Sequence, residues 1–513
     1  MEQLSPEIMA LIAAHLCEVS QTPFLDSSPD FSPDSFPDPF PISRAPYAVI
    51  SRRWQDFVEP WTFSSINLRD TELDTFVEIF VDSRRRGLLR HLTYYIWLPT
   101  GGQSRDDSAE NQTAVSYSIL KLLNVLKDWD DTDARLELQV FAIHDDDTVR
   151  TGMSFECDVT IVGSPTRYIR LDEVELPTVQ CVVSLDIETS PDCALHPIAM
   201  CQLAGTFPHL EKLTMEVLDP VNRRRRMRKD HRLALAAGLA TLKLPKLTHL
   251  SIHRATTTDI RNHNFRCGDF EEDGFDALND ALRELSQTTP LTDLVLTNIL
   301  ISSDLFRSRR TADPDSSIWP TLRNFSIKAG INAPNGRWYY TGDPDAVEPG
   351  RGSSYGDDDG EPSESEELED YDPEANGVRP GHHWRTQPDP GPFNALVKDM
   401  ADAVLRMPQL RTGTLDIGPH DGYPDETIFK CAEATYTFDD RPDQQSDSDE
   451  EKATRRWHVW VGENSEWEVP TDVKVLWTEW LGDSGKFAIS RWYFEQNICE
   501  GKTLEYSVSG TYA

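Results

Sequence analysis

The sequence predicts an α/β protein with an N-terminal helical module, an irregular solenoid of strand–helix units, a β-rich C-terminal part and disordered acidic loops. Three features of the 513-residue chain lead to this prediction: two amphipathic segments in the first sixty residues, a short phrase that recurs five times, and two acidic runs. We place the parts at residues 1–60, 61–335, 336–390 and 391–513.

The N-terminal module is predicted from two apolar helical faces. Ser5 is a suitable N-cap and Pro6 suits the first helical position. Apolar residues then follow at helical spacing, and a second amphipathic segment lies between residues 45 and 58. Because the module is so short, it cannot bury both apolar faces within itself. Either the rest of the chain or a partner must therefore cover them. The apolar positions are Ile8, Leu11, Ile12 and Leu16, followed by Val49, Ile50, Trp54, Phe57 and Val58.

These segments, Leu4-Ser-Pro-Glu-Ile8 and Val49-Ile-Ser-Arg-Arg-Trp54, resemble the F-box. The resemblance implies a non-catalytic receptor, without a cofactor, that binds the Skp adaptor of a cullin ubiquitin ligase and presents a protein substrate. One departure is residues 19–43, a proline-rich insertion where the family has a short connection; we expect it to be a disordered loop. The resemblance places the adaptor contacts at Leu4, Pro6, Ile8, Ile12, Leu16, Val49, Ile50 and Trp54.

After the module, strands and helices are predicted to alternate, which favours parallel strands with helices on one flank. Residues 63–68, 88–98 and 134–143 are predicted strands. Between them, Asp70 is expected to cap one helix, and residues 116–129 form another.

A phrase of the form Pro-x-Leu-x-x-Leu-x-Ile then recurs. It places two apolar side chains on a short strand, after a leucine at the turn that enters the strand. The unit resembles a leucine-rich repeat, although the first leucines of successive copies are 37, 44 and 31 residues apart, which is irregular and long for that family. A generic α/β domain with chance turns is the alternative. The copies begin at Pro208, Pro245 and Pro320, with a shortened copy at Pro290 and a stretched one from Met407 to Ile417.

Acidic residues dominate the net charge of −37, which argues against nucleic acid or an anionic membrane as a partner. Residues 341–376 hold fourteen Asp or Glu and one Arg, a local net of −13. This run and the shorter one at 439–451 are predicted to be disordered.

The C-terminal part is rich in aromatic residues, with tryptophans between residues 457 and 480. Alternating apolar positions there predict antiparallel strands that close the end of the solenoid. The tryptophans are interpreted as core, with a ligand groove as the alternative.

No catalytic or metal site is expected. Gly482-Asp-Ser-Gly485 resembles a protease nucleophile motif, but its flanking residues and the distant His15 do not fit. Cys193, His196, Cys201 and His209 are the one plausible zinc set, and their spacing matches no common zinc motif.

The chain is expected in the cytoplasm, the nucleus or both. Its eight cysteines lack a paired spacing, and no segment resembles a signal peptide or a membrane span. The basic run at 223–229 is either a nuclear import signal or an exposed connector. A repeat-based interaction scaffold outside any ubiquitin ligase is the alternative function.

Overall fold

The computed structural model describes residues 52–99, 105–129, 135–143, 168–171, 175–189, 194–255, 260–307, 318–347, 374, 376–378, 380–418, 427–434, 454–462, 465–483, 485–491, 494–495, 498–499 and 502–507. They belong to two compact units, each described by itself. Unit 1 takes its residues from 1–148, 173–188 and 206–210, and unit 2 takes the others. The fold is mixed α/β with mostly parallel strands, as the sequence predicts.

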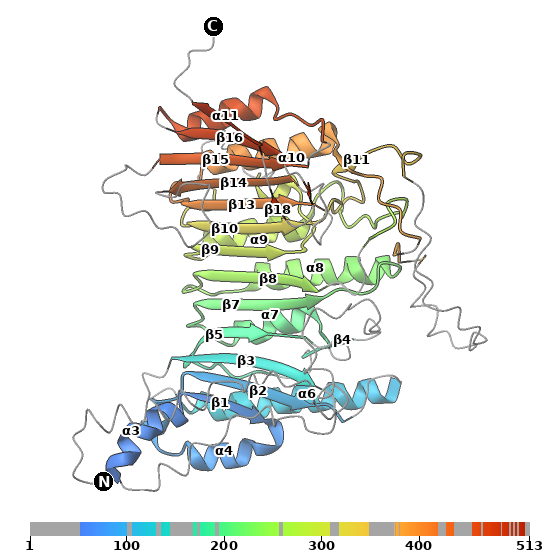
Figure 1. Cartoon of the computed structure of the whole chain (residues 1–513). Helices are drawn as coiled ribbons and strands as arrows, with labels where there is room; N and C mark the ends of the chain where they lie inside the picture. The colour runs from blue at the N-terminus through green and yellow to red at the C-terminus, as the bar shows by residue number, and fades with distance from the viewer. Residues whose placement is uncertain are drawn as a thin grey trace, which may run out of the picture. The chain divides into compact units, whose positions relative to one another are not determined.

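Unit 1 contains four parallel strands in the order β1-β2-β3-β5 (Figure 1). Leu92, Tyr94 and Ile96 of β2 are buried toward the helices, and the Tyr94 hydroxyl donates to the Ser118 carbonyl of α6. The strands are β1 Ser65–Arg69, β2 His91–Trp97, β3 Leu136–Ile143 and β5 Val182–Ile187. The helices are α3 Arg52–Thr62, the 3-10 turn Asp70–Glu72, α4 Leu73–Ile79, α5 Ser83–Arg86 and α6 Arg105–Lys127.

In unit 2, nine of the described strands pair one with the next in the order β7-β8-β9-β10-β13-β14-β15-β16-β19, and the first five are parallel. Beyond them, β15 and β16 pair in parallel and the remaining neighbours are antiparallel. The strands are β7 Lys212–Leu218, β8 His249–Ala255, β9 Asp293–Thr297, β10 Asn324–Ala329, β13 Thr412–Ile417, β14 Thr427–Ala434, β15 Thr454–Val461, β16 Lys486–Arg491 and β19 Lys502–Ser507.

Helices cover one face of the strands in unit 2, and α7, α8 and α9 lie behind the strands in the view of Figure 1. The helices are α7 Pro197–Gly205, α8 Arg225–Thr241, α9 Ala277–Thr288, α10 Pro390–Leu405 and α11 Thr471–Leu481, with a 3-10 turn at Ser303–Leu305. Short pairs join β4 Tyr168–Ile169 to β6 Ala194–Leu195, β11 Tyr340–Thr341 to β12 Gln387–Pro388, and β17 Phe494–Glu495 to β18 Ile498–Cys499.

Every copy of the recurring phrase leads into one of the five parallel strands. In four copies the proline is the second residue of a turn that the following leucine closes by donating its N–H to the residue before the proline, at 3.1–3.4 Å. The leucines of all five copies are buried. The copies are also in register, because Leu213 pairs with Leu250, Leu250 with Leu294, and Leu294 with Phe325.

The fifth copy is not stretched. Phe325 of β10 lies opposite Gly413, and Ile327 lies opposite Leu415, so the copy has the usual length with glycine at its second apolar position. The Phe325 ring occupies the space that a side chain on Gly413 would need. The prediction of a stretched copy is wrong because Gly413 interrupts the apolar pattern of the sequence, while Phe325 of the neighbouring strand fills the space.

The prediction of strands throughout residues 457–480 is wrong in one part. Residues 471–481 form α11, which connects β15 to its parallel neighbour β16. Val473, Trp477, Trp480 and Leu481 recur at helical spacing and are buried, so a helical face outweighs the local alternation.

The two ends of the predicted acidic loop 336–390 carry regular pairing. Tyr340 and Thr341 pair with Pro388 and Gln387, and the Tyr340 hydroxyl donates to the Ile417 carbonyl. The prediction of disorder therefore stays a prediction for residues 348–373, which lie outside the described residues.

Candidate binding surface on the strand face

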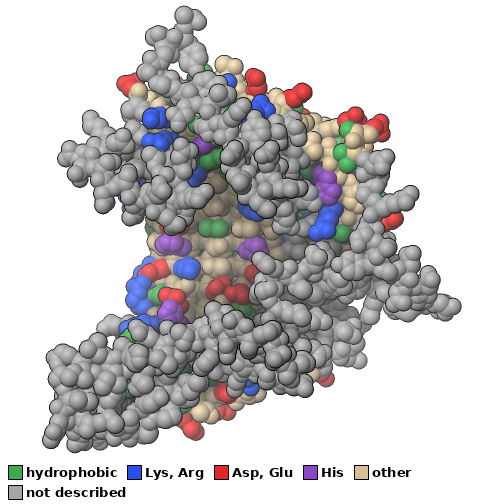
Figure 2. Space-filling view, viewed as in Figure 1, with side chains coloured by type: hydrophobic (Ala, Val, Ile, Leu, Met, Phe, Trp, Pro, Cys, Tyr) green, Lys and Arg blue, Asp and Glu red, His purple; other side chains and the backbone are tan. Residues whose placement is uncertain are grey.

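The side of the five parallel strands opposite the helices is the candidate binding surface, called the strand face below. Alternate side chains point to it, while the leucine and isoleucine positions point to the helices. In Figure 2, which views this side, histidine, basic and acidic side chains dot the uncovered strip. The strand register aligns the side chains in three rows: Lys212, His249, Asp293, Asn324 and Thr412; Thr214, Ser251, Val295, Ser326 and Thr414; and Glu216, His253, Thr297, Lys328 and Asp416.

The first row is a continuous side-chain ladder. His249 Nε2 lies 3.1 Å from Asp293 Oδ2, Asn324 Nδ2 donates to Asp293 Oδ1 at 2.7 Å, and the Thr412 hydroxyl donates to Asn324 Oδ1 at 2.7 Å. Thr248 Oγ1 lies 2.7 Å from His249 Nδ1 at the other end. These bonds orient donors and acceptors of four coils before any partner arrives.

The side chains of the middle row are short, and all of them except Val295 carry a hydroxyl. Val295 is 39% exposed at its centre. The first and third rows lie about 13 Å apart, at roughly 3.3 Å per residue, and carry longer side chains. This arrangement presents hydroxyls and one apolar side chain between two polar borders.

Asp416, at the end of the third row, is a functional candidate that sequence reasoning missed. Burial raises the pKa of its carboxyl, and nearby Lys328 opposes that rise. Its Oδ1 is buried without a hydrogen-bond partner among the described residues. The segment Leu415-Asp-Ile417 in the fifth copy gives no signal for this role, because the burial depends on neighbouring strands.

Backbone bonds between coils hold the strand face rigid. The Thr248 carbonyl accepts the N–H groups of both Thr292 and Asp293, and the Thr292 carbonyl accepts those of Arg323 and Asn324. The carbonyls of Glu211 and Arg323 do the same for the strands that follow them. The residue before each strand therefore fixes where the neighbouring strand begins, and this aligns the side chains into the three rows.

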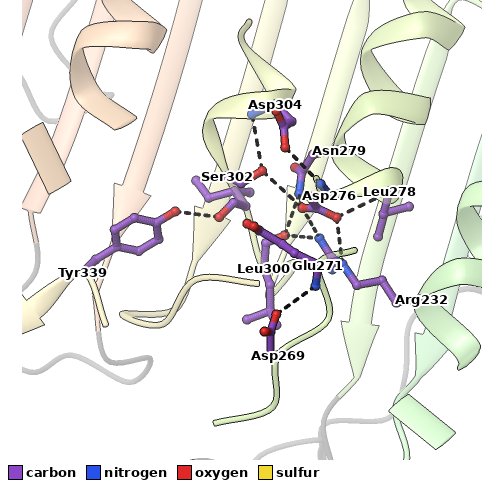
Figure 3. A network of polar contacts seen from close by, with 11 residues as sticks. Arg232, Asp269, Glu271, Asp276, Leu278, Asn279, Leu300, Ser302, Asp304 and Tyr339 are labelled. Atoms are coloured by element: carbon purple, nitrogen blue, oxygen red, sulfur yellow. Dashed lines mark hydrogen bonds and ion pairs between the residues drawn. The ribbon is translucent and has the colours of Figure 1, made fainter. Parts of the chain in front are cut away.

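A buried network at the carboxyl ends of the strands supports this face from the helix side (Figure 3). Asp276 caps α9 by accepting from Leu278 N–H, and it accepts both Nε and Nη2 of Arg232 at 3.1 and 2.7 Å. Asn279 also donates to it, and Arg232 donates onward to the Leu300 carbonyl. The network joins α8, α9 and the loop after β9 without exposing Asp276.

Unit 1 presents a different strand face. Tyr95 and Phe141 stack with ring centroids 5.4 Å apart, and the Arg69 guanidinium lies 5.4 Å above Trp97. Burial raises the pKa of Tyr95, with a contribution from Glu188. Aromatic contacts thus replace the hydroxyl row that unit 2 carries.

Of the eight predicted adaptor contacts, Leu4, Pro6, Ile8, Ile12, Leu16, Val49 and Ile50 lie outside the described residues. Trp54 lies in α3, and the structure describes its backbone alone. Helix α3 itself is fixed to unit 1, because Glu59 is buried and binds both Arg84 and Arg85, the latter at 2.9 Å.

The other sequence candidates do not form a site in the described part of the chain. No group of three or more His, Cys, Asp or Glu there is placed to hold a metal ion, and Cys193 lies outside it. Burial raises the pKa of the Cys201 thiol to about 12. His15 and Ser484 also lie outside the described residues.

None of the described helices is both long and apolar enough to span a bilayer. A scan against protein-family models finds no match, and searches of curated proteins and of solved structures find no similar chain.

Proposed function

We propose that this protein is a substrate-receptor subunit of a Skp–cullin–F-box ubiquitin ligase. Its N-terminal segments bind the Skp adaptor, and the strand face of unit 2 binds a protein substrate. The observation that carries the substrate half is the strand face itself, on which a bonded ladder and an exposed Val295 are aligned across successive strands. The adaptor half rests on the F-box resemblance of residues 4–16 and 49–54.

The proposed architecture is an irregular solenoid of the leucine-rich-repeat kind. Its support is the register of the five copies, each of which adds a buried leucine turn and one strand. Such coils bury their apolar faces on their neighbours and leave an extended surface for recognition.

The proposed mechanism is proximity. A receptor raises the effective concentration of a substrate lysine near the conjugating enzyme and needs no covalent chemistry of its own. Glu59 fixes α3, which carries Trp54, to α5 of unit 1 through its ion pairs with Arg84 and Arg85.

The adaptor half is tested by co-purification with the Skp adaptor. Ile8→Asp combined with Trp54→Ala is expected to abolish capture. Trp61→Ala with Val475→Asp is the matched control, because both residues are exposed and lie outside the predicted contacts. Undiminished capture by the first variant would refute the adaptor half.

The substrate half is tested by proximity labelling in cells. Replacing Val295 by Arg places a charge at the centre of the strand face without touching the core. We expect the set of labelled proteins to lose its most enriched members while adaptor capture is retained. An unchanged set would mean that the strand face does not hold the substrate.

A scaffold that acts outside any ligase is the second candidate, favoured by the packing of α3 on unit 1 through Val58 and Glu59. The two candidates differ in the N-terminal sixty residues of the isolated protein. Strong amide-exchange protection throughout that segment supports the scaffold, and protection gained only on adding the adaptor supports the receptor.

A further inference from the structure

A small cavity lies at the carboxyl ends of β7 and β8, on the helix side of unit 2. Its volume is about 30 Å³, enough for one compact ion or one to two waters but not for a phosphate group. Apolar side chains form part of its wall. The rest of the wall consists of five ionisable side chains: Asp219, Arg228, His231, Arg232 and Arg254.

The charges around this cavity do not balance. Arg228 and Arg254 both donate through Nε to the same oxygen, Asp219 Oδ2, at 3.2 and 2.5 Å. The third guanidinium, Arg232, is neutralised by its two bonds to Asp276. Two cations against one carboxylate leave a surplus of one positive charge.

This surplus is buried. The side chains of Arg228 and Arg254 are 3% and 12% exposed, and no second carboxylate in the described part of the chain forms an ion pair with either. Arg228 also donates to the side-chain oxygen of Asn222, and Arg254 to the Asn298 carbonyl; both oxygens are neutral. A buried charge without a counterion costs several kcal/mol, so the arrangement favours an anion.

His231 supplies an independent observation. Its ring is 5% exposed, lines the cavity, and has an Nδ1 atom that is buried without a hydrogen-bond partner among the described residues. Burial, and to a smaller extent the neighbouring His196, lowers the pKa of His231 to about 4, so the ring is neutral near pH 7. A neutral imidazole with its proton on Nδ1 is a donor that an anion would satisfy.

We propose that this cavity is a binding site for one compact monovalent anion of chloride size, held by Arg228, Arg254 and His231. The volume excludes larger oxyanions, and the apolar part of the wall disfavours a second negative charge. The bound ion ties α8 to the ends of β7 and β8 on the helix side of the strands.

The test measures thermal unfolding of the full chain in sodium chloride, sodium bromide and sodium gluconate at one ionic strength. Chloride and bromide are expected to raise the midpoint in a saturable way, whereas gluconate is too large to enter. Equal midpoints in all three salts, or a rise that does not saturate, would overturn the proposal, since general salt effects do not saturate.

Variants assign the effect to the cavity. Arg254→Gln should lose the chloride-dependent rise, and Arg283→Gln should keep it, because Arg283 is equally buried but pairs with Asp280 away from the cavity. Asp219→Asn should bind chloride more tightly, by more than about tenfold, because it adds a second surplus charge. Retention of the rise in Arg254→Gln, or weaker binding by Asp219→Asn, would overturn the site.

Anomalous diffraction from bromide-soaked crystals gives a readout that does not depend on stability. We expect one bromide peak within hydrogen-bond distance of Arg228 and Arg254. Water density at that position, with no anomalous signal at high bromide, would contradict the proposal.

Discussion

Two hydrogen-bonded side-chain networks of unit 2, one centred on Asp293 and one on Asp276, differ in burial. Asp293 on the strand face is 30% exposed and connects His249 to Asn324. Asp276 in the network behind the strands is 1% exposed and connects Arg232, Leu278 and Asn279. The two networks use similar hydrogen bonds but have different roles, because burial decides whether a polar network stabilises the fold or remains available to a partner.

The largest effect is expected from Asp276→Ala. This change leaves Arg232 charged and buried and removes the N-cap of α9, so the cost should be about 3–5 kcal/mol. Urea unfolding together with amide exchange of residues 277–305 measures the cost. Asp276→Asn is the control that keeps a capping oxygen and should cost less. A loss below about 1 kcal/mol in the alanine variant would remove the distinction between the two networks.

The second-largest effect is expected from acid, which should lower the stability of the fold by protonating buried histidines. Burial lowers the pKa of His263 to about 3 and those of His231 and His458 to about 4. The unfolded chain then binds more protons between pH 6.5 and 4, so stability is full above pH 6.5 and falls as the pH drops through this window. Each ring should contribute on the order of 1–3 kcal/mol.

Urea midpoints at pH 7.5 and pH 5 measure this fall. His263→Gln is expected to reduce this fall, because it removes the ring whose pKa burial lowers furthest. A midpoint independent of pH across this window would mean that the rings are not buried as described.

A smaller effect is expected where two coils meet. Gly413→Ala should cost about 1–3 kcal/mol, because the new methyl group overlaps the Phe325 ring. Phe325→Leu combined with Gly413→Ala should recover part of that cost, and a double-mutant cycle measures the coupling. Additive effects would show that the ring does not fill the space beside the glycine.

The smallest effect on stability is expected on the strand face. Asp293→Ala breaks the ladder but should cost no more than about 1 kcal/mol, since its partners remain hydrated. Its effect should instead be on recognition, measured as lost substrate enrichment in proximity labelling. A large loss of stability would show that the ladder supports the fold as Asp276 does.

The sequence predicts the five parallel strands of unit 2 well, because each copy carries its own buried leucine and four of the copies carry a proline turn. It predicts residues 471–481 poorly, since Val473, Val475 and Trp477 also alternate as a strand would. Pro470 before the helix and Asp472 in its first turn were the overlooked signals.

The binding surface was harder to predict than the strands. The rows depend on register, and the copies are separated by helices and loops of unequal length. His249, Asp293 and Asn324 are far apart in the chain and follow no motif, so only pairing across the strands brings them together. The candidate adaptor contacts remain predictions, since seven of the eight lie outside the described residues.

The fit of Phe325 beside Gly413 also bears on how such a chain can change over time. Coils that share a pattern look exchangeable, yet these two are a matched pair. Deleting the coil of β10 would place Leu294 next to Gly413, where a shorter side chain leaves a void. Whole-coil duplication or loss should therefore be tolerated elsewhere in the array before it is tolerated at this joint.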